Sequence, residues 1–266
     1  MPFKDLLVVL DDEPQARQRL ELAADLAERF DAHLTGLHVT VGTETSRHDG
    51  QPRGEEDRRA HALFDEVVRR RALSAEWRAA RGFPVDVTAV HARYADLIIL
   101  GQIDPGKEWA PVIHPRPEDI ALAAGRPILV VPYVGTFAPV GSQVLVAWDA
   151  SREATRAVND AMPLLAAAAS VTVMTVDPQQ GREAHGDVPG ADIAVHLARH
   201  GVRARVERAV SGEIDVGNTL LSRASDLSAD LLVMGAYAHS RVRELVLGGA
   251  TRTVLESMTL PVLMAH

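Results

Sequence analysis

The sequence predicts an α/β protein built of two tandem doubly wound domains, each with a parallel sheet between layers of helices. Three observations lead to this prediction. Short apolar runs alternate with helical segments, several of these runs are continuously apolar, and the whole pattern occurs twice along the 266 residues. Continuously apolar strands that are joined through helices are typical of parallel sheets covered on both faces.

The first copy opens with an apolar run at residues 5–10, which predicts a strand buried on both faces and ending at Asp11. Pro14 then precedes an apolar stripe at helical spacing that continues to Phe30, so a helix follows this strand. Further strands are expected at residues 33–39, 75–80, 96–100 and 128–131, further helices through residues 60–68 and 85–94, and a polar loop at residues 41–54.

The second copy opens with residues 143–148, which repeat the first strand, and Asp149 stands at the same place as Asp11. Ser151 is expected to cap a helix that continues through Ala161, because serine accepts a hydrogen bond from the first helical turn. Further strands are expected at residues 171–176, 231–234 and 262–264.

The end of each copy also repeats with equal spacing. Gly101 follows a strand and precedes Pro127 by as many residues as Gly235 precedes Pro261. A period of this length indicates a duplicated domain and is too long for a solenoid. We therefore expect domains at residues 1–134 and 143–266, joined by a linker at residues 135–142 that contains proline and glycine.

Composition excludes several classes of function. The net charge of -8 argues against a general nucleic-acid or acidic-membrane surface, since such binders concentrate positive charge. The basic run at residues 69–71 is expected to be a solvated helix face. The absence of cysteine excludes disulfides, thiol catalysis and cysteine metal sites. The first apolar run is too short for a signal sequence or a membrane span, so a cytoplasmic protein is expected.

The segment at residues 231–266 combines a buried strand, a glycine-flanked basic loop and the start of a helix. Such an arrangement offers unpaired backbone N–H groups to an anion such as phosphate. Gly235, Gly248 and Gly249 permit positive φ and close approach of the backbone. A nucleotide is therefore the first ligand to consider.

In an open parallel sheet, ligands bind beyond the carboxyl ends of the strands, where the strand order reverses. Asp149 is expected at this edge and has a carboxylate that accepts hydrogen bonds from an adenine amino group or a ribose hydroxyl. A helix-capping role for Asp149 is the alternative. The full set of candidate nucleotide-binding residues is Ala147, Trp148, Asp149, Val176, Met234, Gly235, Ala238, His239, Gly248, Gly249, Ala250 and Thr251.

The run from Gly235 through Thr251 resembles the signature of universal stress proteins, whose ATP-binding members carry G-x2-G-x9-G-[ST]. The resemblance covers nearly the whole chain, as the tandem-domain type. It implies a five-stranded sheet of order 3-2-1-4-5 in each domain. It also implies that Asp149 faces the adenine or ribose, that Val176 meets the base through its backbone, and that Gly235 and Gly248 hold the phosphates.

The resemblance further implies ATP or AMP as the ligand, with Mg²⁺ as a companion ion. The final strands of the two domains, at residues 128–131 and 262–264, are expected to be edge strands, and unpaired edges seek partners. The resemblance implies that they pair either between the two domains or between chains, and a homodimer is expected. The protein partners of such a regulatory role are not identified by the sequence.

Two positions depart from the signature. Ala238 stands at its second glycine, and Gly249 stands at its serine or threonine. Thr251 offers either a replacement hydroxyl or a helix start, and His239 offers either positive charge beside phosphates or a solvated loop.

The first domain departs further, because equal spacing sets Asp104 against Ala238, and Pro115 and Pro117 against Gly249 and Thr251. Proline lacks the N–H group that a phosphate would use, and Asp104 would repel it. We expect this domain to be free of nucleotide or to hold something else. A metal site formed by His114 with Asp104 or His38 is a weaker alternative, since no tight ligand spacing occurs.

No motif for catalysis or for metal binding is present, so no catalytic residue and no metal ligand is predicted. The first hypothesis is a stress-response protein whose C-terminal domain binds an adenine nucleotide in a regulatory role. The alternatives are a nucleotide-free module that acts through protein partners, and a slow nucleotide hydrolase.

Overall fold

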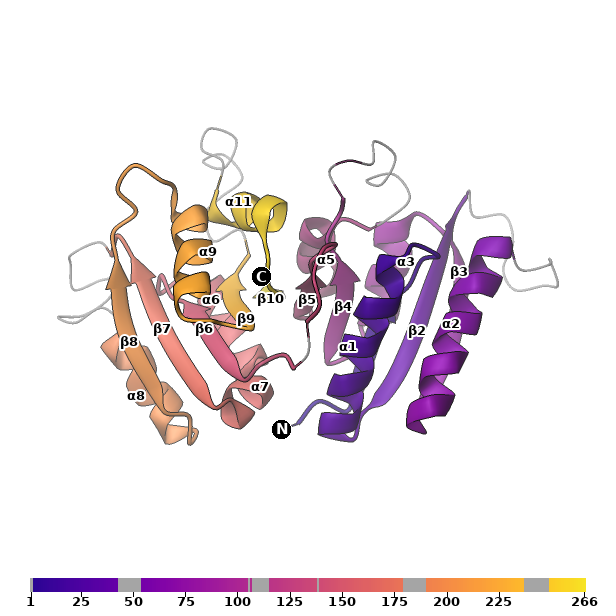
Figure 1. Ribbon diagram of the computed structural model, residues 1–266, viewed down its shortest axis with the longest axis horizontal. Coiled ribbons are helices and arrows are strands. Elements are labelled where there is room, and N and C mark those ends of the chain that lie inside the picture. Colours follow the sequence, from indigo (N-terminus) through magenta and orange to yellow (C-terminus); the bar gives the residue numbers. More distant parts are fainter. Residues whose placement is uncertain are drawn as a thin grey trace. The chain divides into compact units, whose positions relative to one another are not determined.

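The computed structural model describes residues 2–42, 54–104, 106, 115–137, 139–178, 190–236 and 249–266. The chain divides into two compact units, Met1–Ala138 and Pro139–His266. The point of division lies within the stretch 135–142 that the sequence suggests as a linker. Figure 1 shows strands flanked by helices in each unit. None of the helices in the described part of the chain is long and apolar enough to span a membrane.

The first unit contains one parallel five-stranded sheet in the order β3-β2-β1-β4-β5. Helices α1 and α2 cover one face of it, and α3 and α5 cover the other (Figure 1). The strands are β1 (Asp5–Val9), β2 (His33–Val41), β3 (Ala75–Gly82), β4 (Leu97–Gly101) and β5 (Ile128–Val131). The helices are α1 (Gln15–Phe30), α2 (Glu55–Arg71), α3 (Pro84–Ala92) and α5 (Pro117–Ala124).

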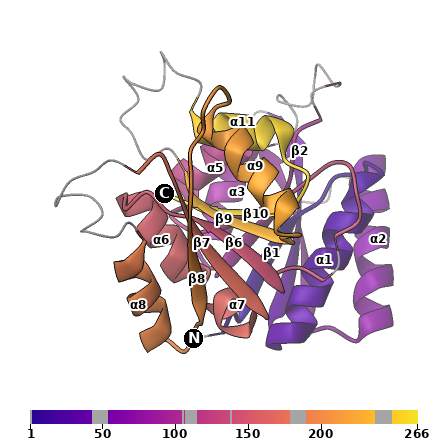
Figure 2. The same cartoon turned by 60° about the vertical axis from the view of Figure 1, so that its left-hand side comes forward.

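The second unit repeats this arrangement, with the strand order β10-β9-β6-β7-β8 and parallel pairing. Figure 2 shows α6 and α8 on one face of these strands and α9 and α11 on the other. The strands are β6 (Gln143–Ala147), β7 (Ser170–Val176), β8 (Ala204–Ala209), β9 (Leu231–Gly235) and β10 (Val262–Ala265). The helices are α6 (Arg152–Asp160), α7 (Met162–Ala167), α8 (Ala191–Arg199), α9 (Val216–Asp226) and α11 (Ala250–Ser257).

The predicted doubly wound fold is confirmed in both units, and so is the strand order 3-2-1-4-5. The strand order reverses between β1 and β4 in the first unit and between β6 and β9 in the second. These four central strands are almost wholly buried, because helices cover both of their faces. The carboxyl ends of the central strands therefore define the edge at which a ligand would bind in each unit.

The helix expected after Ser151 is α6, which ends at Asp160, within one residue of the expected end at Ala161. A further short helix that the sequence analysis did not assign, α7, begins at Met162 with Pro163 in its first turn. Proline has no N–H group to bond to the preceding turn, so it begins a new helix more readily than it continues one. Ser151 caps α6 as predicted, and its Oγ accepts a hydrogen bond from Ala154 N at 3.0 Å.

The basic run at residues 69–71 is solvated at Arg69 and Arg70, as expected, and it also forms ion pairs within the unit. Arg70 and Arg71 of α2 reach Glu21 of α1 at 2.5 and 2.9 Å, and Arg71 also reaches Asp25 at 2.5 Å. Burial opposes the charge on Arg71, but the hydrogen bonds that it donates to Asp25 and Glu21 raise its pKa above the ordinary value. The basic run therefore joins α2 to α1.

Candidate functional site

The carboxyl edge of the second unit is formed by the ends of β6, β7 and β9. Trp148 follows β6, and its N–H group donates to Met174 O on β7 at 2.8 Å. Val176, the last residue of β7, lies two positions beyond Met174, the last β7 residue paired with β6. The backbone of Val176 is therefore paired only with β8. The side of its backbone that faces away from β8 lies beyond the end of β6. Ala147 is half-buried at the end of β6, and Met234 is buried within β9.

Asp149 lies exposed at this edge and is held by the start of α6. Its Oδ1 atom accepts hydrogen bonds from Ser151 N at 3.0 Å and from Ser151 Oγ at 2.6 Å. Its Oδ2 atom accepts no hydrogen bond from any residue that the structure describes. The sequence left a capping role and a ligand-binding role open for Asp149. The structure assigns one carboxylate oxygen to the turn before α6 and leaves the other exposed.

Asp177 follows Val176 and fastens the ends of β7 and β8 together. Its φ of 46° lies in the left-handed region. Its carboxylate accepts from Ser211 N at 3.2 Å and from the Ser211 hydroxyl. Both oxygens are thereby engaged, so Asp177 fixes the rim of the edge and is a poorer ligand group than Asp149.

Gly235 allows the first turn of α6 to pack against the end of β9. A Cβ atom at Gly235 would lie 2.5 Å from Ala154 N and 2.7 Å from the carbonyl carbon of Glu153. Those are backbone atoms, so any side chain would push α6 away from β9. Gly235 therefore has a packing role at this edge that is independent of phosphate.

The start of α11 is fixed by α9. A Cβ atom at Gly217 would lie 2.7 Å from Thr253 Cβ and 2.9 Å from Ala250 O, so the two helices touch at this glycine. Burial raises the pKa of Asp215, but hydrogen bonds from Asn218, from Gly217 N–H and from the Thr253 hydroxyl outweigh it, and the pKa lies below its ordinary value. Asp215 also caps α9 through Asn218 N at 3.1 Å.

The residues expected to hold phosphate are only partly within the described structure. Gly249 is the N-cap of α11, and its carbonyl accepts from Arg252 N at 2.9 Å. Ala250 and Thr251 form the first turn of α11, where helical N–H groups lack intrahelical partners, and Thr251 is buried. Thr251 therefore has the predicted helix-start position. Ala238, His239 and Gly248 lie outside the described residues.

The equivalent edge of the first unit has different chemistry. Arg19 of α1 pairs with Asp11 at 2.6 Å, and their side chains are only 6% and 18% exposed. Asp11 Oδ1 accepts from Glu13 N at 3.0 Å, so both of its oxygens are engaged. A Cβ atom at Gly101 would lie 2.1 Å from Arg19 Nη1. The guanidinium group therefore fills the space above the end of β4.

The weaker metal hypothesis finds no support in the described residues, which contain no group of three or more His, Cys, Asp or Glu able to hold a metal ion. His38 is buried and donates from Nδ1 to Leu10 O at 2.9 Å, which gives it a structural role. His114 lies outside the described part of the chain.

Sequence reasoning missed Arg19, Ser211 and Asp215. Asp215 was detectable, because Asp-Val-Gly-Asn before an apolar run is typical of a capped helix start. Arg19 had no such signal, since an arginine within an amphipathic helix normally lies on its solvated face.

Comparison with known proteins agrees with this architecture. The model of the universal stress protein family matches residues 2–111 and 142–266. A universal stress protein from Archaeoglobus fulgidus DSM 4304 shares 16% identity and a TM-score of 0.75, with 98% of this chain and 96% of that chain covered. A functionally unknown protein from Pseudomonas aeruginosa PAO1 shares 17% identity and a TM-score of 0.61, with 98% and 92% covered.

No curated protein matches the sequence. At these identities the two solved structures establish the fold alone. The family match is of another kind, because it covers most of the chain and occurs once in each unit. The resemblance noted in the sequence is thereby confirmed, and the chain belongs to the universal stress protein family.

Proposed function

We propose that this chain binds an adenine nucleotide, ATP or AMP, at the carboxyl edge of residues 139–266 and thereby acts as a regulator in a stress response. The observation that carries the proposal is the state of Asp149. Its Oδ1 is anchored by Ser151, which fixes the orientation of the side chain, and its exposed Oδ2 is available to a ribose hydroxyl or an adenine amino group. A fixed acceptor binds a ligand without the entropic cost of ordering it.

Three neighbouring features support the same proposal. Val176 ends β7, the strand next to β6, and its backbone is not paired with β6. Gly235 brings the start of α6 to the edge, and Gly217 brings the start of α11 there. Helix N-termini favour phosphate, through their free N–H groups and the helix dipole. Mg²⁺ would be held by the nucleotide phosphates and water, because the described residues provide no carboxylate cluster for it.

Titration calorimetry of the full chain with ATP and AMP, each with and without Mg²⁺, tests the proposal. We expect binding, and we expect Asp149→Asn to weaken it about tenfold through loss of a hydrogen bond to a charged acceptor. Asparagine retains an oxygen for Ser151, so the turn should persist. Asp226→Asn is the matched control. Asp226 is also an exposed aspartate of the second unit, but it lies at the C-terminal end of α9.

Absence of binding by both nucleotides at millimolar concentration would contradict the proposal and favour the nucleotide-free interaction module. If the Asp149→Asn variant bound nucleotide as tightly as the wild type, the role given to Asp149 would be contradicted. Phosphate release that Asp149→Asn leaves unchanged would point to a contaminating hydrolase. Sedimentation with and without nucleotide tests the homodimer expected from the family.

Restoring the family signature provides a second test in the opposite direction. The double variant Ala238→Gly, Gly249→Ser removes one methyl group and adds one hydroxyl near the expected phosphate position. We expect the affinity for ATP to rise about fivefold or more, because a methyl group at a close backbone approach costs about 1 kcal/mol. The affinity for adenosine should not change, and an equal rise for both ligands would contradict a phosphate-binding role for these positions.

A further inference from the structure

Helix α3 of the first unit carries apolar side chains on the face that it turns away from the sheet. Phe83 at its N-cap is 65% exposed, Val90 is 51% exposed, and Tyr94 in the turn after the helix is 80% exposed. Val87 lies between them and is half-buried. Spacings of four, three and four residues place these side chains along one side of the helix. We call these four residues the α3 stripe.

Single exposed apolar residues are ordinary on a protein surface, but a row of them along one helix is not. The inward face of α3, with Thr88, Ala89 and Ala92, is buried within the unit. The helix is therefore mostly apolar on both of its faces. Helices of this kind are normally covered on both faces, so the α3 stripe indicates a contact surface.

The corresponding helix of the second unit shows that the fold does not require such a stripe. The N-cap of α3 is Phe83, and the N-cap of α9 is Asp215. Counted from these N-caps, the four stripe positions of α9 carry only polar side chains, which are Asp215, Thr219, Ser222 and Asp226. A face that is polar in one unit and apolar in the other points to a contact made by the first unit.

Two opposite charges beside the α3 stripe identify the partner. Asp86 and Arg93 are both exposed and stand seven residues apart, which places them on the same flank of the stripe, two turns from each other. Neither side chain forms an ion pair with another residue that the structure describes. If two α3 helices pack antiparallel about a twofold axis, Asp86 of each copy lies opposite Arg93 of the other. The stripe is thus complementary in charge to a second copy of itself.

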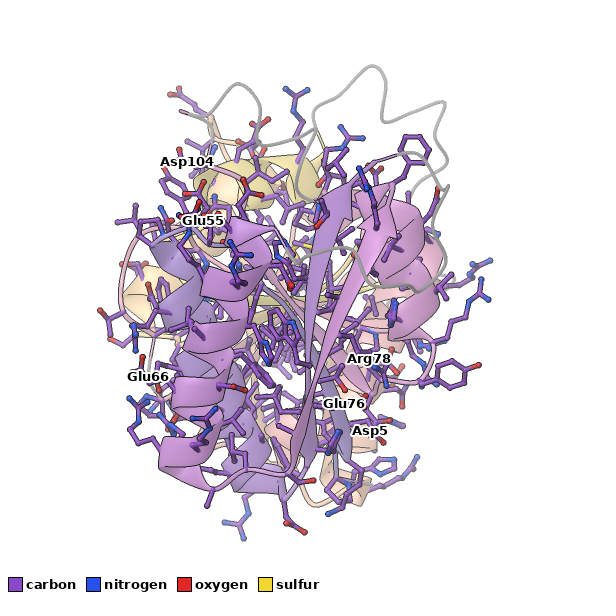
Figure 3. All side chains as sticks on the ribbon, turned by 90° about the vertical axis from the view of Figure 1, so that its right-hand side faces the viewer. Asp5, Glu55, Glu66, Glu76, Arg78 and Asp104 are labelled. Carbon is purple, nitrogen blue, oxygen red and sulfur yellow. The ribbon has the colours of Figure 1, made fainter. Side chains whose placement is uncertain are left out.

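The other flank of the α3 stripe holds its charges within the unit. Arg78 of the edge strand β3 pairs with Glu76, and its Nη1 atom lies 3.5 Å from Nδ1 of His91 on α3. Figure 3 shows Glu76 and Arg78 beside each other and well away from Glu66 of α2. The flank with Asp86 and Arg93 therefore offers the charges that a partner can pair.

We propose that the α3 stripe binds the α3 stripe of a second copy of this chain, as an antiparallel helix pair with twofold symmetry. The apolar side chains of the two stripes cover each other, and Asp86 of each copy pairs with Arg93 of the other. The two aromatic rings and the two valines offer roughly 400 Å² for burial. That area is about half of what each partner contributes to a standard interface, so the dimer is a weak one. The contact belongs to the first unit and is independent of the nucleotide proposal.

Sedimentation equilibrium of the full chain, from micromolar to millimolar concentration, measures this association. We expect a monomer–dimer equilibrium that Val90→Asn weakens about tenfold or more, because the substitution occurs twice in a symmetric contact. Val195→Asn is the matched control, since Val195 is 50% exposed on α8 and Val90 is 51% exposed on α3. A chain that stays monomeric at millimolar concentration overturns the proposal. So does a dimer that the two variants affect equally, as they would affect a contact through the edge strands.

Charge reversal tests the antiparallel geometry. Asp86→Arg and Arg93→Asp should each weaken the dimer at least about tenfold, because like charges then face each other twice. An equimolar mixture of these two variants should dimerise again, since one copy carries arginine at both positions and the other carries aspartate at both. If either variant loses its folded circular dichroism spectrum, the double variant Asp86→Arg, Arg93→Asp decides, and it should dimerise like the wild type. A mixture of folded variants, or a double variant, that associates no more tightly than a single variant overturns the proposal.

Discussion

Arg17 and Arg19 show how two arginines on one helix differ in their surroundings. Arg17 pairs with Glu66 at 2.8 Å, with side chains about half exposed, whereas the Arg19–Asp11 pair is almost buried. Solvent screens the first pair and not the second. Removing Arg19 takes the guanidinium counter-charge away from the largely buried Asp11 carboxylate.

We therefore predict that Arg19→Met lowers the free energy of unfolding by about 3 kcal/mol, the usual cost of breaking a buried ion pair from one side. Methionine is similar in length, so the loss reports charge more than volume. Arg17→Met should have a much smaller effect. Urea unfolding of both variants measures the difference, and equal losses would show that the Arg19 pair is screened like a surface pair.

Asp215 provides a prediction on pH. Burial opposes its charge, but hydrogen bonds from Asn218, Gly217 and Thr253 lower its pKa below the ordinary value of 3.8. A lowered carboxyl pKa means that the folded state holds fewer protons than the unfolded state. The stability from Asp215 is therefore complete above pH 3.8 and is lost as the pH falls through the folded pKa.

Asp215→Asn keeps an oxygen that can cap α9 but does not titrate. We predict that wild type exceeds this variant in unfolding free energy near neutral pH and that the difference shrinks below pH 3.8. Urea unfolding at a series of pH values measures this difference. A difference that stays constant down to about pH 2 would exclude the carboxylate as its cause.

At the residue scale, the sequence was sufficient for side chains placed by local rules. Ser151 was predictable as a cap, and Asp149 at a strand end, because each follows from its immediate neighbours. The function of Arg19 was not predictable, because it depends on a contact with Asp11 across a helix and a strand. The sequence also does not reveal that Gly101 and Gly235 make room for different groups.

At the scale of elements, the contact between α9 and α11 positions the candidate phosphate end. Gly217 lies against Thr253 and Ala250 with no space for a methyl group. We predict that Gly217→Ala destabilises the fold by about 1–3 kcal/mol through overpacking, although alanine favours helices. The start of α11 should move, so the affinity for nucleotide phosphate should fall.

Ser222→Ala is the matched control, because Ser222 is exposed on the same helix and alanine is again the product. It should keep or slightly raise the stability. Thermal unfolding with and without ATP measures both effects. A Gly217→Ala variant as stable as Ser222→Ala would mean that α9 and α11 separate at no cost.

Elements differed in how well the sequence predicted them. Continuously apolar strands such as β1 and β9 were found within one residue of their observed ends. The edge strand β8 was not assigned. Charged residues at Arg205, Glu207 and Arg208 interrupt its sequence, so it contains no continuous apolar run. Pro163 is the local signal that divides α6 from α7, and it outweighs the continuous apolar spacing.

At the scale of the whole molecule, the two units share one fold but differ at their carboxyl edges. Ala157 stands eight residues after Asp149, at the same spacing that separates Arg19 from Asp11. Among the described residues of the second unit, no cation pairs with the strand-end carboxylate of Asp149, and its Oδ2 accepts no hydrogen bond from them. The two units therefore differ in the groups that surround an aspartate at the same position of the fold, Asp11 in the first unit and Asp149 in the second.

Each unit has its own five-stranded sheet and its own buried core, so each should fold alone. We predict that residues 139–266, expressed alone, unfold cooperatively and bind ATP with an affinity within about threefold of the full chain. Residues 1–138 should fold and bind no ATP, because Arg19 occupies Asp11 and Pro115 and Pro117 stand at the phosphate positions. Calorimetry on both fragments measures this. If the second fragment folds but loses ATP, residues of the first unit must complete the site, and binding by a single unit is refuted.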